Sequence, residues 1–197
     1  MWRRCDGPLH VSGGFWLLLG WFLYANGWRL LLTVLAAAGL HECGHYAVLR
    51  LLGTRVVSMR VGVFGAEMKA SGALSYAGEL AAVLAGPAAN LLWGVALASL
   101  GKTWFEAAGA HLVLCAFNLL PVRPLDGGRA LELAVSWAAG PSAGDRTARW
   151  VGVAVSLAMA GGLTWLAWRS GSLWLLPAAA GSAKIAISEL APAKKVK

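Results

Sequence analysis

Long apolar runs, separated by short polar or glycine-containing segments, dominate the hydrophobic pattern of the chain. A helix needs about 20 mostly apolar residues to cross the hydrocarbon core of a bilayer. Runs of this kind predict transmembrane helices near residues 11–26, 29–52, 76–100, 104–120, 149–168 and 172–189. The pattern therefore predicts an all-α polytopic membrane protein with about six spans, the first two joined by a turn at Asn26 and Gly27.

Two segments between the spans follow other patterns. Residues 54–71 lack a helical period and place Val, Met and Phe around Gly62 and Gly65, which predicts two short strands in a membrane-associated β-hairpin. Residues 127–140 predict a short amphipathic helix that ends before Pro141. Because no segment is long enough for a separate soluble domain, we expect a single membrane-embedded core over residues 1–197.

Composition excludes an ordinary soluble domain. Of the residues, 58% are hydrophobic, 13% are charged and 11 are tryptophan, and the mean hydropathy is +0.64. Cys5, Cys43 and Cys115 are far apart and odd in number, so we expect free thiols rather than a disulfide framework. No small-x-small cleavage site follows the apolar run 15–25, which is therefore predicted to be an uncleaved span and not a secretory signal.

The basic residues predict an orientation in the membrane. Six spans place both termini on one side, and all of the 17 Lys and Arg residues except Arg29, Lys102 and Arg169 then fall on that side. Cytoplasmic loops carry such an excess, so we expect cytoplasmic termini in a bacterial cell membrane. The net charge of +8 is explained by this topology and by an anionic inner leaflet, and it gives no reason to expect a nucleic-acid partner.

Residues 41–45, HECGH, place two histidines and a glutamate inside the apolar run 29–52. On a helix, His41 and His45 lie on one face one turn apart, where both imidazoles can reach one zinc ion. Glu42 lies beside that face, where its carboxylate can hold an attacking water and accept its proton. Two core histidines and a buried glutamate bonded to other helices are the alternative, but ionisable groups within a span are costly, which favours a metal site. His41 is closer to Arg50 than to Arg29 along the helix, so the site is expected inside the bilayer, nearer the cytoplasmic face.

A catalytic zinc ion usually has three protein ligands and one open position, so a third ligand is needed. Residues 118–129, NLLPVRPLDGGR, contain one acidic side chain, that of Asp126. The prolines keep this stretch out of a helix, and Gly127 and Gly128 allow close approach of the backbone. Because Asp-Gly-Gly before a helix is also a turn or N-cap pattern, the residues alone leave open whether Asp126 is a ligand or a cap.

Together, HECGH and the later N-x-x-P-x-x-P-L-D-G-G pattern of residues 118–128 resemble the site-2 protease family of intramembrane zinc metalloproteases. The form of the second motif is most similar to the branch of stage IV sporulation protein FB, which cleaves a membrane-associated sigma-factor precursor. The resemblance implies that His41, His45 and Asp126 bind one catalytic zinc ion and that Glu42 is the general base. It also implies that Asn118 lies near the metal and hydrogen-bonds the substrate backbone or the oxyanion, although a structural interhelical hydrogen bond stays an open alternative.

Two further features of the spans are interpreted as packing. Ala82, Gly86, Asn90 and Gly94 recur every four residues and predict a ridge of small side chains against span 29–52, with a kink at Gly86 and Pro87. This G-P-x-x-N pattern also resembles the family. His111 is interpreted as a hydrogen-bonded packing residue, since a lone histidine is more often that than a ligand.

The predicted function is zinc-dependent endoproteolysis of a transmembrane or membrane-associated protein segment, within the lipid bilayer. A free strand edge in 54–71 is expected to pair with the substrate as its helix unwinds, as the resemblance also implies. A zinc transporter and a catalytically silent scaffold are the alternatives, but the outer halves of the spans carry few polar residues and the motif is intact. The chain is expected to be a core without PDZ or CBS domains. Its sequence leaves open the substrate, any membrane-protein regulator and the oligomeric state.

Overall fold

The computed structural model of the chain describes residues 9–62, 65–171 and 175–190. Predictions that concern the N-terminal arginines, Cys5, the hairpin tip at 63–64, the start of the last span at 172–174 and the basic tail lie outside these residues. The chain divides into two compact units, Met1–Leu119 and Leu120–Lys197. Helices predominate in both units, and one small sheet lies in the first, as predicted.

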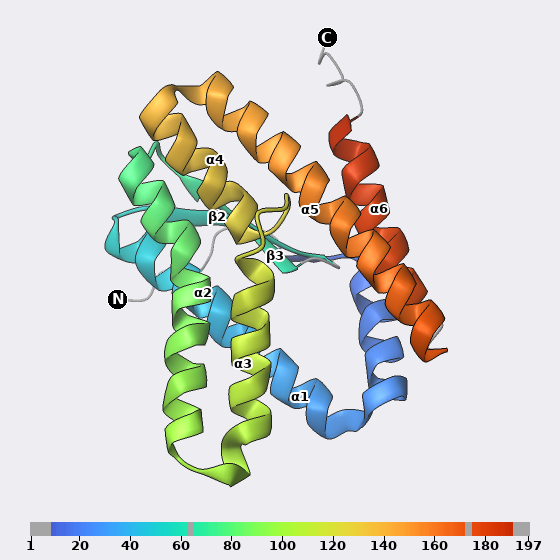
Figure 1. The fold of residues 1–197 in the computed structure, drawn as a ribbon. Coiled ribbons are helices and arrows are strands. Elements are labelled where there is room, and N and C mark those ends of the chain that lie inside the picture. Colours follow the sequence, from blue (N-terminus) through green and yellow to red (C-terminus); the bar gives the residue numbers. More distant parts are fainter. Residues whose placement is uncertain (1–8, 63–64, 172–174, 191–197) are drawn as a thin grey trace. The chain divides into compact units, whose positions relative to one another are not determined.

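Helix α1 (Gly13–Leu51) contains both of the first two predicted spans. Ser12 caps it, because its hydroxyl oxygen accepts a hydrogen bond from the amide of Phe15 at 3.3 Å. Gly27 interrupts it with φ 79° and ψ 170°, a conformation that glycine adopts without steric cost. Figure 1 shows the two segments of α1 meeting at a sharp bend, so the predicted turn at Asn26 and Gly27 is confirmed.

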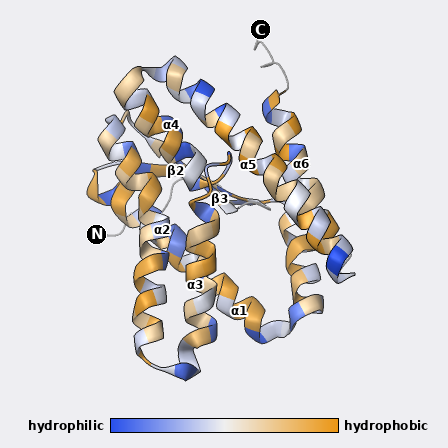
Figure 2. Ribbon diagram, in the orientation of Figure 1, coloured by the Kyte–Doolittle hydropathy of each residue, from blue (hydrophilic) through white to orange (hydrophobic). Residues whose placement is uncertain are grey.

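Helices α2 (Tyr76–Ser99) and α3 (Phe105–Asn118) lie side by side, joined through a short 3-10 turn, Lys102–Trp104 (Figure 1). Both are largely hydrophobic in Figure 2. A Cβ atom at Gly94 would lie 2.7 Å from Cδ2 of Leu112. The absence of a side chain at Gly94 therefore allows α3 to approach α2 closely.

A three-stranded sheet packs on this helical unit. Strand β2 (Arg55–Gly62) pairs antiparallel with β3 (Gly65–Ser71), which confirms the predicted hairpin, and parallel with β1 (Leu9–Val11), which was not predicted. The sheet order β1-β2-β3 makes β3 an edge strand. Leu49 of α1, Val56 of β2 and Ala82 of α2 form a buried apolar cluster. The hairpin is thus anchored on the two helices beside His45.

The second unit consists of α4 (Asp126–Ala139), α5 (Pro141–Ser170) and α6 (Leu176–Leu190), with α5 packed on both of the others. The predicted amphipathic helix 127–140 is confirmed as α4. Gly140, with φ 93°, makes the turn into α5.

An ion-pair network joins the loop before α4 to α4, α5 and α6. The guanidinium of Arg123 contacts Glu132 at 3.1 Å, Asp145 at 2.9 Å and Glu189 at 3.4 Å. Burial would lower the pKa of Arg123, but the hydrogen bond to Asp145 and the surrounding carboxylates raise it overall, so the side chain stays cationic. Arg123 therefore fixes the loop from which Asp126 follows.

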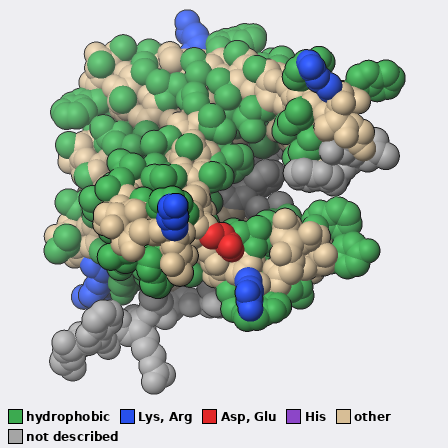
Figure 3. All heavy atoms as spheres, turned by 60° about the horizontal axis from the view of Figure 1, so that its bottom comes forward, with side chains coloured by type: hydrophobic (Ala, Val, Ile, Leu, Met, Phe, Trp, Pro, Cys, Tyr) green, Lys and Arg blue, Asp and Glu red, His purple; other side chains and the backbone are tan. Residues whose placement is uncertain are grey.

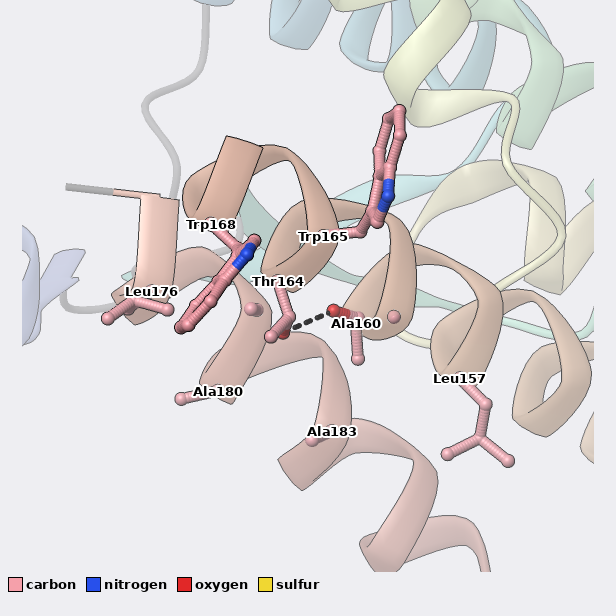
Figure 4. A pocket seen from close by; sticks show the side chains of 10 residues that line it. Leu157, Ala160, Thr164, Trp165, Trp168, Leu176, Ala180 and Ala183 are labelled. Carbon is pink, nitrogen blue, oxygen red and sulfur yellow. Dashed lines mark hydrogen bonds between the residues drawn. The ribbon is translucent and has the colours of Figure 1, made fainter. Parts of the chain in front are cut away.

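An apolar groove of about 860 Å³ runs between α5 and α6. Figure 4 shows Trp165 and Trp168 beside it, with Thr164 donating a hydrogen bond to the carbonyl oxygen of Ala160 at 2.7 Å. The described residues that line the groove are Leu, Ala, Gly, Thr and Trp, and none of them has an ionisable side chain for acid, base or metal chemistry.

The chain is an integral membrane protein. Among the described residues, α1, α2 and α5 are long and apolar enough to cross a membrane. Large hydrophobic side chains such as Trp16, Leu17 and Tyr24 are exposed, and hydrophobic groups dominate the face seen in Figure 3. The predicted count of about six spans is not confirmed, since α3 has 14 residues and α6 has 15, fewer than a perpendicular span needs.

Candidate metal centre

His41 and His45 lie one turn apart on the second segment of α1, and their rings converge. Their Nε2 atoms are 3.0 Å apart, and the ring planes are at 81° to each other. Two imidazole nitrogens at about 2.0–2.1 Å from one zinc ion can span this separation. His41 is 5% exposed, so little water competes for its ring.

Helix α2 holds the outer nitrogen of each ring. Nδ1 of His45 donates a hydrogen bond to the carbonyl oxygen of Ala82 at 2.8 Å. In the neutral imidazole this leaves the lone pair on Nε2, the nitrogen that faces His41. Nδ1 of His41 lies 3.1 Å from the amide nitrogen of Asn90. Both rings are therefore oriented by groups of α2, and the hydrogen bond from His45 to a backbone carbonyl is typical of histidines that bind a metal.

Two glycines allow α1 and α2 to come this close. A Cβ atom at Gly44 would lie 2.6 Å from the carbonyl oxygen of Ala85. A Cβ atom at Gly86 would collide with Nε2 of His45 and would lie 2.7 Å from Nε2 of His41. The space in front of both Nε2 atoms thus exists because residue 86 has no side chain. The small residues of α2 that were predicted to pack on the helix with His41 and His45 therefore do pack on it.

Glu42 contacts the hairpin. Its Oε1 accepts a hydrogen bond from the backbone amide of Ala66, at the start of β3, at 3.3 Å. This hydrogen bond fixes the position of the Glu42 carboxylate relative to β3. Cys43, the next residue, is exposed.

Asn118, predicted near the metal, is the last residue of α3. Its amide nitrogen donates to the carbonyl oxygen of Leu114, one turn back, at 3.0 Å. The side chain is half-buried. This hydrogen bond of the Asn118 amide nitrogen lies within α3, whereas the alternative considered from the sequence was a hydrogen bond between helices.

Asp126 is the first residue of α4, in the second unit. The sequence left open whether Asp126 is a metal ligand or a helix N-cap. In the structure the N-cap of α4 is Leu125 and not Asp126. The helix dipole stabilises a carboxylate in the first turn. A Cβ atom at Gly128 would lie 2.6 Å from the backbone of Val122, so the glycine allows the tight turn in front of the helix.

His41, His45 and Asp126 carry donor atoms of the kinds that bind metal ions, two imidazole nitrogens and a carboxylate. Two imidazoles and one carboxylate are a common donor set for catalytic zinc, which leaves one position for water. These donor types, together with the open space that Gly86 leaves in front of the two Nε2 atoms, suggest a metal site.

Sequence reasoning missed the contacts of Asn90. A signal was present, because Ala82, Gly86 and Asn90 repeat the four-residue interval of His41 and His45 on the partner helix. His111 was expected to be a hydrogen-bonded packing residue. It is 3% exposed, and its Nδ1 donates to Oδ1 of Asn90 at 2.9 Å, so it is buried and hydrogen-bonded, as expected.

Comparison with known proteins gives related sequences and one shared fold. No family model matches the chain. It is 31% identical over 201 residues to a protein of Mycobacterium tuberculosis named zinc metalloprotease Rip3, across 89% of this chain and 50% of the relative. It is 29% identical over 144 residues to stage IV sporulation protein FB of Bacillus subtilis, across 68% of this chain and 50% of the relative. The chain thus spans about half the length of the curated relatives it matches.

Among solved structures, a site-2 protease from Methanocaldococcus jannaschii matches with a TM-score of 0.70 and 20% identity, over 100% of this chain and 97% of that chain. The two chains have the same fold.

We expect Gly86→Ala to lose bound metal, because the new methyl group occupies the space in front of both Nε2 atoms. Metal content of the purified protein in detergent, measured by mass spectrometry, checks this. Gly39→Ala is the matched control, since a Cβ atom there meets nothing within 4 Å. Zinc retained at the level of the unmodified chain by a folded Gly86→Ala protein would contradict the assignment of this space to a metal.

Proposed function

Because this chain belongs to the site-2 protease family, we propose that it is a zinc-dependent intramembrane endopeptidase. Its substrate is a transmembrane or membrane-associated protein segment. The observation that carries the proposal is the convergence of His41 and His45, beside Glu42, on an apolar helix long enough to cross a membrane. Such groups are costly within a span unless they serve chemistry.

His41, His45 and Asp126 are the proposed ligands of one zinc ion. The donor types support this assignment, as do the Nε2 separation of 3.0 Å and the contacts that orient both rings from α2. Zinc, when bound there, supplies a Lewis acid that makes water nucleophilic near neutral pH.

Glu42 is the proposed general base. Its carboxylate accepts a proton as water attacks the carbonyl carbon of the substrate, and the same proton can pass to the leaving amine. The amide of Ala66 donates a hydrogen bond to Oε1, which orients the carboxylate.

Asn118 is proposed to contact the substrate backbone or the developing oxyanion. Its amide nitrogen now donates to Leu114, so it has to exchange this local partner for the substrate. A donor directed at the oxyanion contributes about 2.7–4 kcal/mol to stabilisation of the transition state.

Strand β3 is proposed to receive the unwound substrate. A peptide bond within a helix is protected by its own hydrogen bonds, and a strand edge can replace those bonds as the helix opens. Two observations support this role: β3 is an edge strand of the sheet, and its residue Ala66 contacts the proposed base.

The setting of the reaction is also part of the proposal. The charge bias of the sequence supports cytoplasmic termini and a site nearer the cytoplasmic face of the membrane. The match to stage IV sporulation protein FB makes a sigma-factor precursor one substrate to test. A membrane-protein regulator would fit a protease of this kind.

The decisive variant is Glu42→Gln. We expect it to abolish cleavage of a co-expressed membrane-segment substrate while zinc remains bound, because the amide cannot accept a proton but leaves the ligands in place. His41→Ala is expected to lose both zinc and cleavage. Immunoblotting of the substrate and metal analysis of the purified variants measure the two effects separately.

Cleavage that survives Glu42→Gln would overturn the mechanism. Zinc binding without cleavage of any membrane segment by the unmodified chain, coupled to zinc uptake into vesicles, would identify a transporter instead. The absence of both activities would identify a scaffold.

The edge strand generates a further prediction. The amide of Ala66 points to Glu42 rather than to β2, and N–H groups alternate in direction along an antiparallel strand, so Met68 also directs its N–H away from β2. Met68→Pro removes this donor and should slow cleavage without loss of zinc, whereas Met68→Ala keeps the donor and should cleave normally. Substrate turnover and metal content are measured together. Normal turnover by Met68→Pro and by Ala70→Pro would rule out substrate pairing at this edge.

A further inference from the structure

A chain of hydrogen bonds runs from His41 into the interior, through one residue on each of two other helices. Asn90 of α2 lies between the rings, with its amide nitrogen 3.1 Å from Nδ1 of His41 and its oxygen 2.9 Å from Nδ1 of His111 on α3. His41 is 5% exposed, Asn90 0% and His111 3%. The three side chains therefore satisfy one another in a region that water does not reach.

We propose that Asn90 and His111 are positioning residues, which set the ring orientation and the tautomer of His41 for metal binding. The inference rests on the proposed function, because it takes Nε2 of His41 as a metal-binding atom. Neither residue touches substrate or the metal; both act through His41.

Asn90 suits this role because an amide carries a donor and an acceptor at equal reach. As the structure stands, His111 donates to Asn90, and Asn90 donates to Nδ1 of His41. Once Nε2 of His41 binds a metal, the ring proton resides on Nδ1, which then needs an acceptor. A half-turn of the amide presents its oxygen to His41 and its NH₂ group to Nδ1 of His111, and the ring proton of His111 then resides on Nε2 instead of Nδ1. The buried chain stays satisfied in both arrangements.

The packing of α2 and α3 makes this chain possible. Gly94 lies one turn beyond Asn90 and carries no side chain against Leu112, the neighbour of His111. Gly86, one turn before Asn90, provides the space at the two Nε2 atoms. One face of α2 thus offers, in successive turns, a carbonyl oxygen to His45, an open space, and an amide to His41. Asn90 thus contacts Nδ1 of His41 as the carbonyl oxygen of Ala82 contacts Nδ1 of His45.

The test measures zinc affinity of the full chain in detergent, by competition with a chromophoric chelator, and the visible spectrum of the cobalt-substituted protein. Asn90→Leu has a similar volume without polar atoms, and we expect its zinc affinity to fall about 10- to 100-fold with an altered cobalt spectrum. Asn90→Asp keeps an acceptor for His41 and should retain most of the affinity. His111→Leu should weaken binding, and His111→Asn, whose amide can occupy the place of Nδ1, should restore it.

Cys115→Ala is the matched control, because Cys115 is buried one turn from His111 and is outside the chain of hydrogen bonds. It should bind zinc normally. The double variant Asn90→Leu/His111→Leu should lose no more affinity than Asn90→Leu alone, since both residues act on the same ring.

Unchanged affinity in both leucine variants, or losses that add in the double variant, would overturn the proposal and leave the two residues as packing groups. If Asn90→Leu does not fold, the comparison of His111→Leu with His111→Asn still decides, because packing alone predicts no rescue by asparagine. The proposed function fails separately, if the unmodified chain and His41→Ala bind zinc equally.

Discussion

Two imidazoles can converge inside a pair of apolar helices only if the second helix comes close without filling the space between them. Helix α2 meets this requirement with glycine and alanine. Gly86 leaves open the region in front of both Nε2 atoms, and the carbonyl oxygen of Ala85 lies where a side chain at Gly44 would be. Larger residues at these positions would separate the helices, and the rings would lose both their common space and their partners on α2.

Close packing also explains how polar chemistry is sustained in a membrane protein. In a low-dielectric interior each buried polar group needs a partner, and each satisfied contact is stronger than in water. His45 is held by a backbone carbonyl of α2, His41 by the amide of Asn90, and Glu42 by a backbone amide of β3. The helices and the hairpin thus orient the two histidines and the proposed base before substrate arrives, which is the condition for electrostatic catalysis.

Features set by local spacing could be predicted from the sequence. The His41 and His45 pair follows from helix geometry, the break at Gly27 from turn chemistry, and the hairpin 54–71 from its lack of a helical period. Features set by long-range pairing could not. Strand β1 has three residues and pairs with residues some 50 positions away, and the Asn90 contacts depend on how two helices align. Asp126 was predicted to be a zinc ligand from the family resemblance, because the residue pattern alone also allowed a helix cap.

We propose that two histidines and one aspartate bind a single zinc ion that activates water for peptide hydrolysis. X-ray absorption spectroscopy of the zinc-loaded protein tests it most directly. We expect one zinc ion per chain, with two imidazole nitrogens and carboxylate or water oxygens at about 2.0–2.2 Å. A sulfur ligand at about 2.3 Å, as Cys43 would provide, or a zinc ion without imidazole ligands, would contradict it.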